Sequence, residues 1–305
     1  MEELLAPGTR TCAGCGAATA IRMVLRAIQK DVGKNFIVCN ATGCMEVATT
    51  PYPETSWRIP WIHVAFENVS AVASGINAAY KYTSENDKTN NNNKTEKPKI
   101  IAIGGDGSTF DIGFGSLSGM LERNDDVLYI CYDNEAYMNT GVQQSGSTPK
   151  FASTSTTPSG KVIPGNLQRK KNLVEIAAAH NVYAASTTIY NFRDLENKVR
   201  KALKIKGAKY IQIFASCPTG WRIPEKDAIK ITKLAIETGI YKVFEIENGK
   251  FNLNYKPAKR KKVEEYLKVQ GRFRHLTQQQ IDEIQDGIDK EWRELEKTNV
   301  SAVTI

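Results

Sequence analysis

No long uncharged apolar run occurs in the sequence, and this argues against a membrane span. Residues 1–7 also lack the basic start and the apolar stretch of a signal peptide, so we expect a cytoplasmic protein whose six cysteines stay reduced. There is no internal repeat. Lysine and arginine outnumber aspartate and glutamate by 41 to 33, but they are spread along the chain except for one cluster at 256–262, which disfavours nucleic acid as a partner. That cluster is most simply a solvated face, and docking of an acidic protein is the alternative.

Helical and strand patterns alternate along the 305 residues, of which 41% are apolar, enough for a sizeable core. Apolar residues recur at helical spacing over 17–30 and 69–82. Short apolar runs, partly β-branched, predict strands at 36–39, 99–103, 127–131, 182–185, 210–215 and 241–246. Apolar strands that alternate with helices predict a doubly wound α/β fold, with a mostly parallel sheet covered on both faces.

The regions between and after these elements complete the predicted organisation. The asparagine-rich segment 84–98 predicts a surface loop, and the Ser/Thr/Gly/Pro-rich segment 145–166 predicts a long binding loop rather than a linker. Two helical patterns follow residue 263. We therefore expect one large domain at 1–255 and a helical C-terminal extension at 256–305.

Four of the six cysteines have the spacing of metal ligands. Cys12 and Cys15 form a C-x-x-C turn rich in glycine, which leaves backbone N–H groups free to bond the sulfides of a cluster. Cys44 follows a flexible Thr-Gly pair, and Cys217 follows an apolar run. Four thiolates from three loops fit an iron–sulfur cluster; a tetrahedral zinc site and a redox dithiol pair with inert thiols are the alternatives.

Other residues are more simply structural. Cys39 and Cys131 lie inside apolar runs and are expected to be small buried hydrophobes. His63 has apolar neighbours in the sequence, which predicts a structural histidine. Arg58 stands between two tryptophans, so we expect it either to stack at an interface or to meet a substrate carboxylate or another subunit.

The sequence Gly105-Asp106-Gly107 follows the apolar run 99–103 and is therefore expected at the carboxyl end of a strand, where open α/β sheets bind ligands. Glycine lets the backbone approach a phosphate, and Asp106 offers a hard oxygen ligand to magnesium. The next apolar run leads to Asn134, which offers a second oxygen. A Gly-Asp-Gly sequence alone is usually a turn, but with a strand before it and a strand leading to asparagine after it, the pattern favours a thiamine diphosphate enzyme.

Four short segments carry a family resemblance: Cys-Ala-Gly-Cys-Gly at 12–16, Asn-Ala-Thr-Gly-Cys at 40–44, Gly-Asp-Gly at 105–107 with Asp-Ile-Gly-Phe-Gly at 111–115, and Tyr-Met-Asn-Thr-Gly at 137–141. They resemble the β subunit of the 2-oxoacid:ferredoxin oxidoreductases, in particular the type that acts on pyruvate. The resemblance covers nearly the whole chain and includes the segments 50–53, 57–63 and 270–273. The insertion at 84–98 departs from it, and as a loop it affects no site residue.

The resemblance implies a role for each matching residue. The implied ligands of one 4Fe-4S cluster are Cys12, Cys15, Cys44 and Cys217. Magnesium is implied to be held by the side chains of Asp106 and Asn134 and by the Ala136 carbonyl. The catalytic residue is implied to be Asn139, which would donate a hydrogen bond to a developing oxyanion. The implied thiamine diphosphate-binding residues are Thr42, Gly43, Cys44, Gly105, Asp106, Gly107, Ser108, Asn134, Asn139 and Thr140.

The reaction implied by the resemblance is the oxidative decarboxylation of pyruvate with coenzyme A to acetyl-CoA, CO₂ and reduced ferredoxin, in either direction. The implied partners are the α, γ and δ subunits of the same enzyme. The α subunit would supply the glutamate that activates the cofactor, so this chain should be inactive by itself. A branched-chain 2-oxoacid such as 2-oxoisovalerate is the alternative substrate. A non-redox thiamine diphosphate decarboxylase and a zinc-stabilised binding module are the alternative functions.

Overall fold

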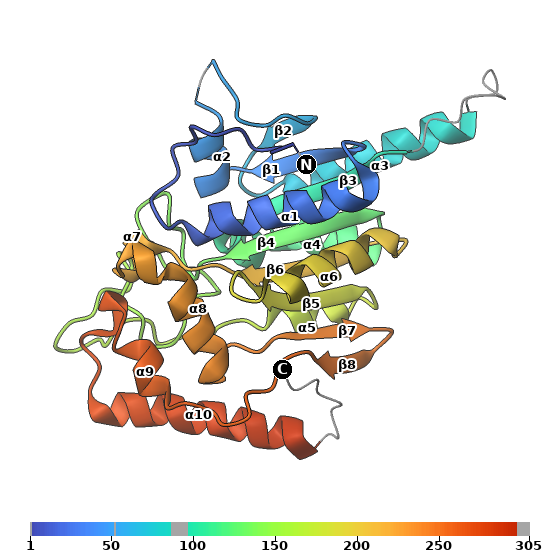
Figure 1. Cartoon of the computed structure of the whole chain (residues 1–305). Coiled ribbons are helices and arrows are strands. Elements are labelled where there is room, and N and C mark those ends of the chain that lie inside the picture. The colour runs from blue at the N-terminus through green and yellow to red at the C-terminus, as the bar shows by residue number, and fades with distance from the viewer. Residues whose placement is uncertain (1, 52, 87–96, 298–305) are drawn as a thin grey trace.

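A mostly parallel sheet forms the centre of the computed structural model, which describes residues 2–51, 53–86 and 97–297 (Figure 1). In this described part the sheet has eight strands, in the order β2-β1-β3-β4-β6-β5-β7-β8. Their bounds are Phe36–Ala41 (β1), Trp61–Val64 (β2), Lys99–Gly105 (β3), Val127–Asp133 (β4), Tyr183–Thr188 (β5), Lys209–Phe214 (β6), Phe244–Glu247 (β7) and Lys250–Leu253 (β8). Strands β1 to β6 pair in parallel, and β7 and β8 are antiparallel at one edge. The predicted doubly wound fold is therefore confirmed.

The strands at the edges of the sheet are where the sequence-based prediction was incomplete. The predicted run 241–246 contains β7 only from Phe244 onward, and β2 and β8 were not predicted. Strand β2 has four residues, of which Ile62 and His63 are exposed, and β8 is buried only at Leu253. Both strands are only four residues long and are interrupted by polar residues, so they lack the longer apolar run that marks a buried strand in the sequence.

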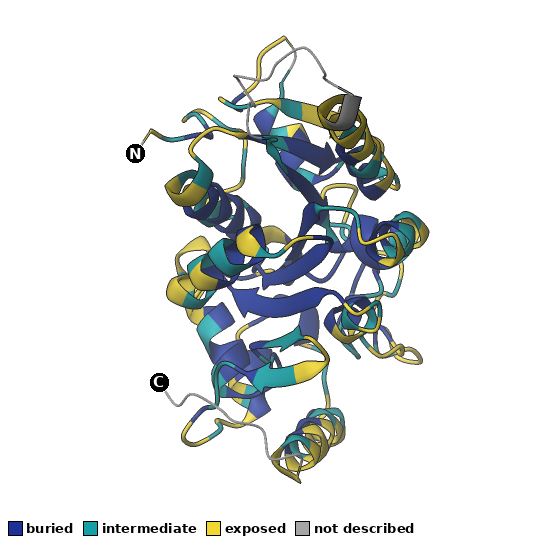
Figure 2. Cartoon of the chain, turned by 90° about the vertical axis from the view of Figure 1, so that its right-hand side faces the viewer, coloured by how far each residue is buried: buried dark blue, intermediate teal, exposed yellow. Residues whose placement is uncertain are grey.

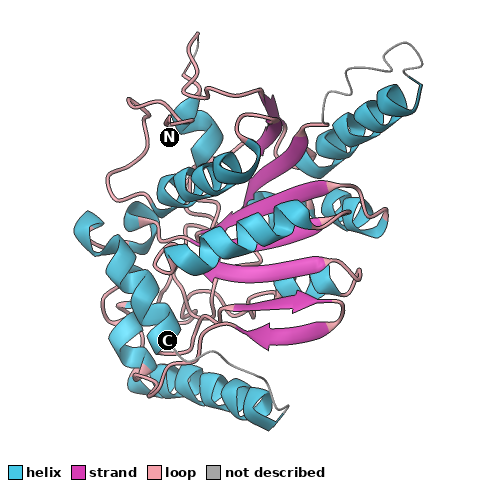
Figure 3. Cartoon of the chain, turned by 45° about the vertical axis from the view of Figure 1, so that its right-hand side comes forward, coloured by secondary structure: helices cyan, strands magenta, loops and turns pink. Residues whose placement is uncertain are grey.

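Helices cover both faces of the sheet (Figures 2 and 3). On one face α1 (Gly16–Val32) and α6 (Phe192–Lys204) contact each other and share a core with the strands. The other face is covered by α3 (Val69–Asn86), α4 (Phe114–Glu122) and α5 (Leu173–Ala178). The remaining helical segments are α2 (Cys44–Thr49), η1 (Gly107–Ile112), α7 (Pro218–Trp221), η2 (Glu225–Asp227), α8 (Ala228–Glu237), α9 (Val263–Leu267), η3 (Gly271–Phe273) and α10 (Gln278–Lys297).

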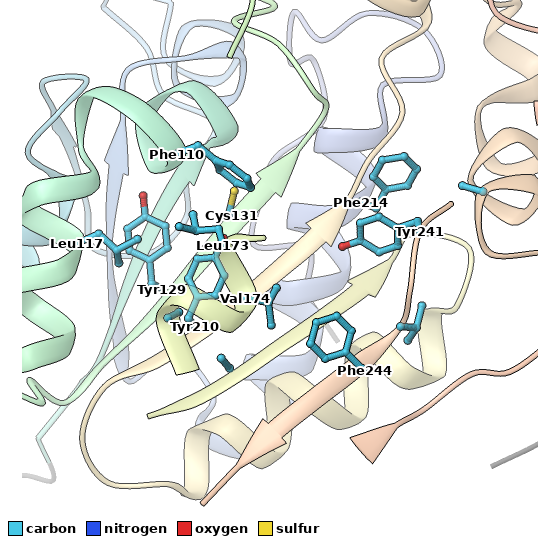
Figure 4. Packing of buried hydrophobic residues seen from close by; sticks show 14 of the residues in the cluster. Phe110, Leu117, Tyr129, Cys131, Leu173, Val174, Tyr210, Phe214, Tyr241 and Phe244 are labelled. Atoms are coloured by element: carbon cyan, nitrogen blue, oxygen red, sulfur yellow. The ribbon is translucent and has the colours of Figure 1, made fainter. Parts of the chain in front are cut away.

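Aromatic rings fill much of the core on the face of the sheet that α3, α4 and α5 cover (Figure 4). The ring centroids of Tyr129 and Tyr210 are 5.9 Å apart, and those of Phe214 and Tyr241 are 4.4 Å apart. Cys131 is fully buried in this core. The predicted burial of Cys131 as a small apolar side chain is therefore confirmed.

Cys39 is fully buried in the same core, as predicted, and burial raises the pKa of its thiol to about 12. The predicted loop 84–98 needs a correction, since α3 continues to Asn86. Most of that segment, 87–96, lies outside the described residues. Across the described ranges, no helix is long and apolar enough to cross a bilayer.

The basic cluster 256–262 is largely paired with acidic side chains of neighbouring helices. Lys256 lies 3.1 Å from Glu296 and Arg260 lies 2.6 Å from Asp289, both on α10. A third pair links Lys261 to α8 through Glu237, at 3.0 Å. Lys259, Lys261 and Lys262 are exposed, so the cluster is a solvated face that also makes ion pairs with the neighbouring helices, and docking of an acidic protein stays a prediction.

Candidate cofactor and metal site

A cavity opens at the carboxyl ends of β1, β3 and β4. Parallel strands point their carboxyl ends to the same edge of a sheet, so segments far apart in the sequence meet there. The structure brings all the predicted cofactor-binding residues to this cavity: Thr42, Gly43, Cys44, Gly105, Asp106, Gly107, Ser108, Asn134, Asn139 and Thr140. Ala136 lines it as well.

Among the described residues that line the cavity, Asp106 is the acidic one, and it is buried. Its carboxyl is 1% exposed, with Oδ1 accepting a hydrogen bond from the Asn134 backbone N–H at 3.2 Å and Oδ2 accepting one from the Ser145 hydroxyl at 2.5 Å. Burial, followed by the nearby charge of Asp133, raises the pKa of Asp106 well above its usual value. A cation bound here would offset the repulsion between the carboxyl groups of Asp106 and Asp133.

Three oxygen-bearing groups meet beside this carboxyl. One atom of the Asn134 side-chain amide lies 2.9 Å from Asp106 Oδ1 and 2.9 Å from the Ala136 carbonyl oxygen. Magnesium binds oxygens at about 2.1 Å in octahedral geometry, which puts neighbouring ligands about 3 Å apart. With its nitrogen toward these two oxygens the amide donates a hydrogen bond to each, and with its oxygen toward them it can join them as a ligand of one cation. The residues therefore fit a magnesium ion.

The glycines of the Gly-Asp-Gly sequence make room for aromatic rings. A Cβ atom on Gly107 would stand 2.4 Å from the Tyr137 ring, and one on Gly105 would stand 3.1 Å from the Tyr132 ring. The hydroxyl of Tyr137 also donates to the Gly107 carbonyl at 3.1 Å. The sequence predicted that these glycines let a phosphate approach the backbone, and the structure adds this second reason for them.

Asn139 and Thr140 reach the cavity from a tight turn after β4. The turn is closed by Gln143, whose Oε1 accepts from the Thr140 hydroxyl at 2.6 Å and whose Nε2 donates to the Thr140 carbonyl at 2.8 Å. The side chain of Asn139 is exposed and has no hydrogen-bond partner among the described residues. Its amide is therefore available to a ligand, because other side chains close the turn.

The four predicted cluster ligands converge beside the cavity: Cys12 lies on a loop, Cys15 and Cys217 are the N-caps of α1 and α7, and Cys44 is the first residue of α2. Burial and then the nearby thiols of Cys217, Cys15 and Cys12 raise the pKa of Cys44 to about 12. Backbone N–H groups donate to two of the sulfurs, from Ala18 to Cys15 Sγ at 3.4 Å and from Gly220 to Cys217 Sγ at 3.2 Å.

Cys12 is exposed, whereas Cys15, Cys44 and Cys217 are half-buried. Within the described ranges, no group of three or more His, Cys, Asp or Glu side chains is arranged to hold a metal ion. The set of four ligands therefore stays a prediction.

Two residues lie elsewhere than the sequence suggested. His63 is exposed rather than surrounded by apolar groups, and its Nε2 lies 2.7 Å from the Thr42 hydroxyl. The rings of Trp57 and Trp61, which flank Arg58 in the sequence, stack on each other at 5.9 Å, and a contact of Arg58 with a substrate or another subunit stays a prediction. The Arg58 guanidinium faces the N-terminal segment, 3.9 Å from Glu2.

The cavity wall includes side chains that sequence reasoning missed: Phe66, Tyr132, Tyr137 and Met138. Tyr132 lies inside β4, and Phe66 and Tyr137 follow shortly after β2 and β4, so these aromatic residues resemble core residues in the sequence. The loop 145–166 was predicted to bind a ligand. In the structure its side chains donate hydrogen bonds to the buried carboxyl groups next to the cavity. Ser145 bonds Asp106 and Ser147 bonds Asp133, each at 2.5 Å.

The fold and this cavity define a class of protein, the thiamine pyrophosphate enzymes. A family model described as "Thiamine pyrophosphate enzyme, C-terminal TPP binding domain" matches residues 41–213, from the end of β1 into β6. The chain is 54% identical to the pyruvate synthase subunit PorB of Methanocaldococcus jannaschii, with 95% of each chain covered. It is 46% identical to that of Thermotoga maritima, with 94% of this chain and 90% of the relative covered. The chain therefore belongs to the family of pyruvate synthase PorB subunits.

One further relative and one solved structure are also similar to this chain. The ketoisovalerate oxidoreductase subunit VorB of Pyrococcus abyssi is 42% identical over 97% of this chain and 93% of its own. Among solved structures, a 2-oxoglutarate:ferredoxin oxidoreductase from Magnetococcus marinus has a similar fold, with a TM-score of 0.57 at 22% identity. The match covers 74% of this chain and 77% of the chain in that structure.

Proposed function

We propose that this chain is the thiamine diphosphate-binding subunit of a pyruvate:ferredoxin oxidoreductase. The enzyme would convert pyruvate and coenzyme A to acetyl-CoA and CO₂ while reducing ferredoxin, and would also run in reverse. The observation that carries the proposal is the meeting of the Asp106 carboxyl, the Asn134 side-chain amide and the Ala136 carbonyl at the edge of the cavity. Relatives named as pyruvate synthase subunits, similar over nearly the full length of both chains, support the choice of pyruvate.

The residues of the cavity would divide the binding of thiamine diphosphate and magnesium among them. Asp106, Asn134 and the Ala136 carbonyl would hold the magnesium, which neutralises the diphosphate. Ser108 and Thr140 line the same cavity with hydroxyl groups that can donate to phosphate oxygens. When bound, thiamine diphosphate supplies a carbon nucleophile and an electron sink for decarboxylation. The exposed amide of Asn139 would donate a hydrogen bond where negative charge develops on the substrate oxygen.

The cysteines would carry the electrons out of the site. Cys44 lines the cavity, and its thiol is close enough to those of Cys12, Cys15 and Cys217 for each to raise its pKa. A 4Fe-4S cluster takes one thiolate on each of four irons, and backbone N–H groups near its sulfurs tune its potential. A cluster held by these four residues would lie directly beside the cofactor cavity, which gives electrons a short path to ferredoxin.

Other subunits would complete the active site. The resemblance implies α, γ and δ subunits in one cytoplasmic enzyme, with the activating glutamate supplied by the α subunit. Exposed apolar side chains on elements at or next to the cavity, Val47 on α2, Ile62 on β2 and Ile112 on η1, favour a partner surface there. The second candidate substrate is 2-oxoisovalerate, because a ketoisovalerate oxidoreductase subunit is 42% identical over nearly the whole chain.

The test is to purify the chain with its copurifying subunits under anaerobic conditions and to measure ferredoxin reduction with each 2-oxoacid. We expect the reduction to require added coenzyme A and thiamine diphosphate, with a kcat/KM for pyruvate well above that for 2-oxoisovalerate. The isolated chain serves as the control and should be inactive. Release of CO₂ from pyruvate without any electron acceptor would instead identify a non-redox decarboxylase.

A further inference from the structure

Glu135 stands between the two proposed magnesium ligands Asn134 and Ala136, although its own side chain does not line the cavity. Its backbone has a φ of 68°, in the left-handed region that non-glycine residues adopt only at a cost in energy. This conformation reverses the chain between its two neighbours, so that a side chain before it and a carbonyl after it face the same point. The surrounding structure must therefore hold Glu135 in place.

Side chains from several distant segments provide this hold. The carboxylate of Glu135, 5% exposed, accepts from Lys170 Nζ at 2.9 Å and from Arg272 Nη2 at 2.6 Å. Its backbone is fixed as well, because the N–H donates to Asp133 Oδ1 at 3.1 Å and the carbonyl accepts from the Thr148 hydroxyl at 2.8 Å. Every polar group of this residue thus has a partner.

Arg272 also acts on the other side of the turn. Its guanidinium is 3% exposed and lies over the ring of Trp221, 4.1 Å from the centroid, while Nε donates to Gln270 Oε1 at 2.9 Å. The indole N–H of Trp221 donates to the Asn134 backbone carbonyl at 2.8 Å. Trp221 is the last residue of α7, the helix whose N-cap is Cys217. One arginine therefore supports the turn both through Glu135 and through this tryptophan.

The charges of this buried group balance only with Arg272 present. Lys170 is shared, since it also lies 2.7 Å from Asp133 Oδ2, so two cations face two carboxylates. Removing one partner of a buried ion pair leaves the other charge without compensation in a low dielectric. Without Arg272, Lys170 alone would face both Asp133 and Glu135.

We propose that Arg272 is a positioning residue for the metal site: it holds the turn at 134–136 in the shape that lets Asn134 and Ala136 share a cation with Asp106. This proposal rests on the proposed function and deepens it. Arg272 lies in the predicted C-terminal extension, so that extension would be part of the cofactor site and not only a packing appendage.

The test uses the assembled enzyme carrying Arg272→Gln, with Arg260→Gln as a matched control. Arg260 lies in the same extension and makes the same kind of contacts, 2.6 Å from Asp289 and 5.6 Å from the centroid of the Trp292 ring. The magnesium concentration needed for half-maximal thiamine diphosphate binding is measured by calorimetry, and thermal unfolding is measured in parallel. Manganese, bound in place of magnesium, reports its ligand geometry by electron paramagnetic resonance.

We expect Arg272→Gln to raise the half-saturating magnesium concentration about tenfold or more, as is usual when a supporting partner of a metal ligand is lost, and to change the manganese spectrum. Excess magnesium should restore most of kcat. Arg260→Gln should leave the magnesium requirement unchanged even where it lowers the unfolding temperature. A variant at Arg272 with lowered thermal stability but the wild-type magnesium requirement and manganese spectrum would overturn the proposal.

If the Arg272→Gln variant does not assemble, the same measurements are made on Arg272→Lys. Lysine keeps the charge but has neither the planar fork nor the stacking surface of arginine, so a smaller rise in the same direction is expected. An unchanged magnesium requirement in that variant would equally overturn the proposal. The two proposals fail differently: a wild-type enzyme that binds no thiamine diphosphate with magnesium would sink the proposed function, whereas wild-type binding retained in both Arg272 variants would sink only this inference.

Discussion

Ser145 donates a hydrogen bond to Oδ2 of Asp106 over 2.5 Å, which leaves Oδ1 of the same carboxyl facing Asn134. The two residues are 39 positions apart, and the loop that carries Ser145 is irregular. Because a carboxylate held at one oxygen cannot rotate freely, the other oxygen is aimed at the place where the magnesium is proposed to bind. The loop thus orients a ligand that it does not itself supply.

Replacing Asp106 should therefore remove the metal site. In the assembled enzyme we expect Asp106→Ala to abolish magnesium-dependent thiamine diphosphate binding and to leave the visible spectrum of the cluster intact, because carboxylate and thiolate ligation are separate chemistries. Ser145→Ala keeps the carboxylate but loses a hydrogen bond to a charged group, so we expect a loss in magnesium affinity of about tenfold. Calorimetry measures both. Tight cofactor binding by the alanine variant at Asp106 would rule out its assignment as a ligand.

The six cysteines should divide into four that bind iron and two that do not. Serine in place of Cys12, Cys15, Cys44 or Cys217 should lower the iron content of anaerobically purified enzyme, since each would supply one thiolate to the cluster. Cys39→Ser and Cys131→Ser are the internal controls, because both side chains are fully buried in the core. Iron per chain and the visible absorption check the result. Loss of the cluster on changing Cys39, with retention on changing Cys44, would reverse the assignment.

The residues that meet at the cavity could be predicted from the sequence because parallel strands end at the same edge of a sheet. Thr42, Asp106 and Asn134 each follow an apolar strand, and parallel strands end at the same edge, so their convergence follows from local patterns and topology. Strands β2 and β8, at the edges of the sheet, could not be predicted in this way, because they are four residues long and largely unburied.

The support of the site could not be predicted in the same way. Glu135 and Arg272 are 137 residues apart, and nothing local in either segment marks an ion pair. Likewise, the partners of the basic cluster lie on α8 and α10, at positions that only the tertiary structure determines. Charges that are buried and paired over long distances resemble solvated charges in the sequence.

The C-terminal extension should unfold together with the sheet. Trp292 of α10 is 2% exposed, belongs to the same core as the strands, and donates its indole N–H to the Gly239 carbonyl at 2.9 Å. Trp292→Ala should cost about 3–5 kcal/mol of stability, as for other buried aromatic residues. Phe192→Ala, at a side chain that is 55% exposed, is the control with little expected effect. Circular dichroism and fluorescence should report one shared transition; two separate transitions would instead support independent units at 1–255 and 256–305.

The two explanations for Gly107 make different predictions. Its substitution by alanine should weaken cofactor binding, because the new Cβ would stand 2.4 Å from the Tyr137 ring. If that ring is the cause, adding Tyr137→Ala should restore part of the binding. If the backbone must instead approach a phosphate, the double variant should bind no better than Gly107→Ala alone. Thiamine diphosphate titrations of the three variants decide between them, with thermal unfolding as a check on folding.

Asn139 should act on the chemical step more than on cofactor binding. Its side chain lines the cavity, is exposed, and leaves the closing of its turn to Thr140 and Gln143. An amide in this place can donate to an oxyanion, and losing one such donor typically costs on the order of a hundredfold in turnover. Asn139→Ala should therefore bind thiamine diphosphate nearly normally and reduce the cluster slowly. Single-turnover reduction by pyruvate at saturating cofactor measures this step, with Gln143→Ala as the control for a disturbed turn. An unchanged rate in Asn139→Ala, or an equal loss in Gln143→Ala, would leave Asn139 with a structural role.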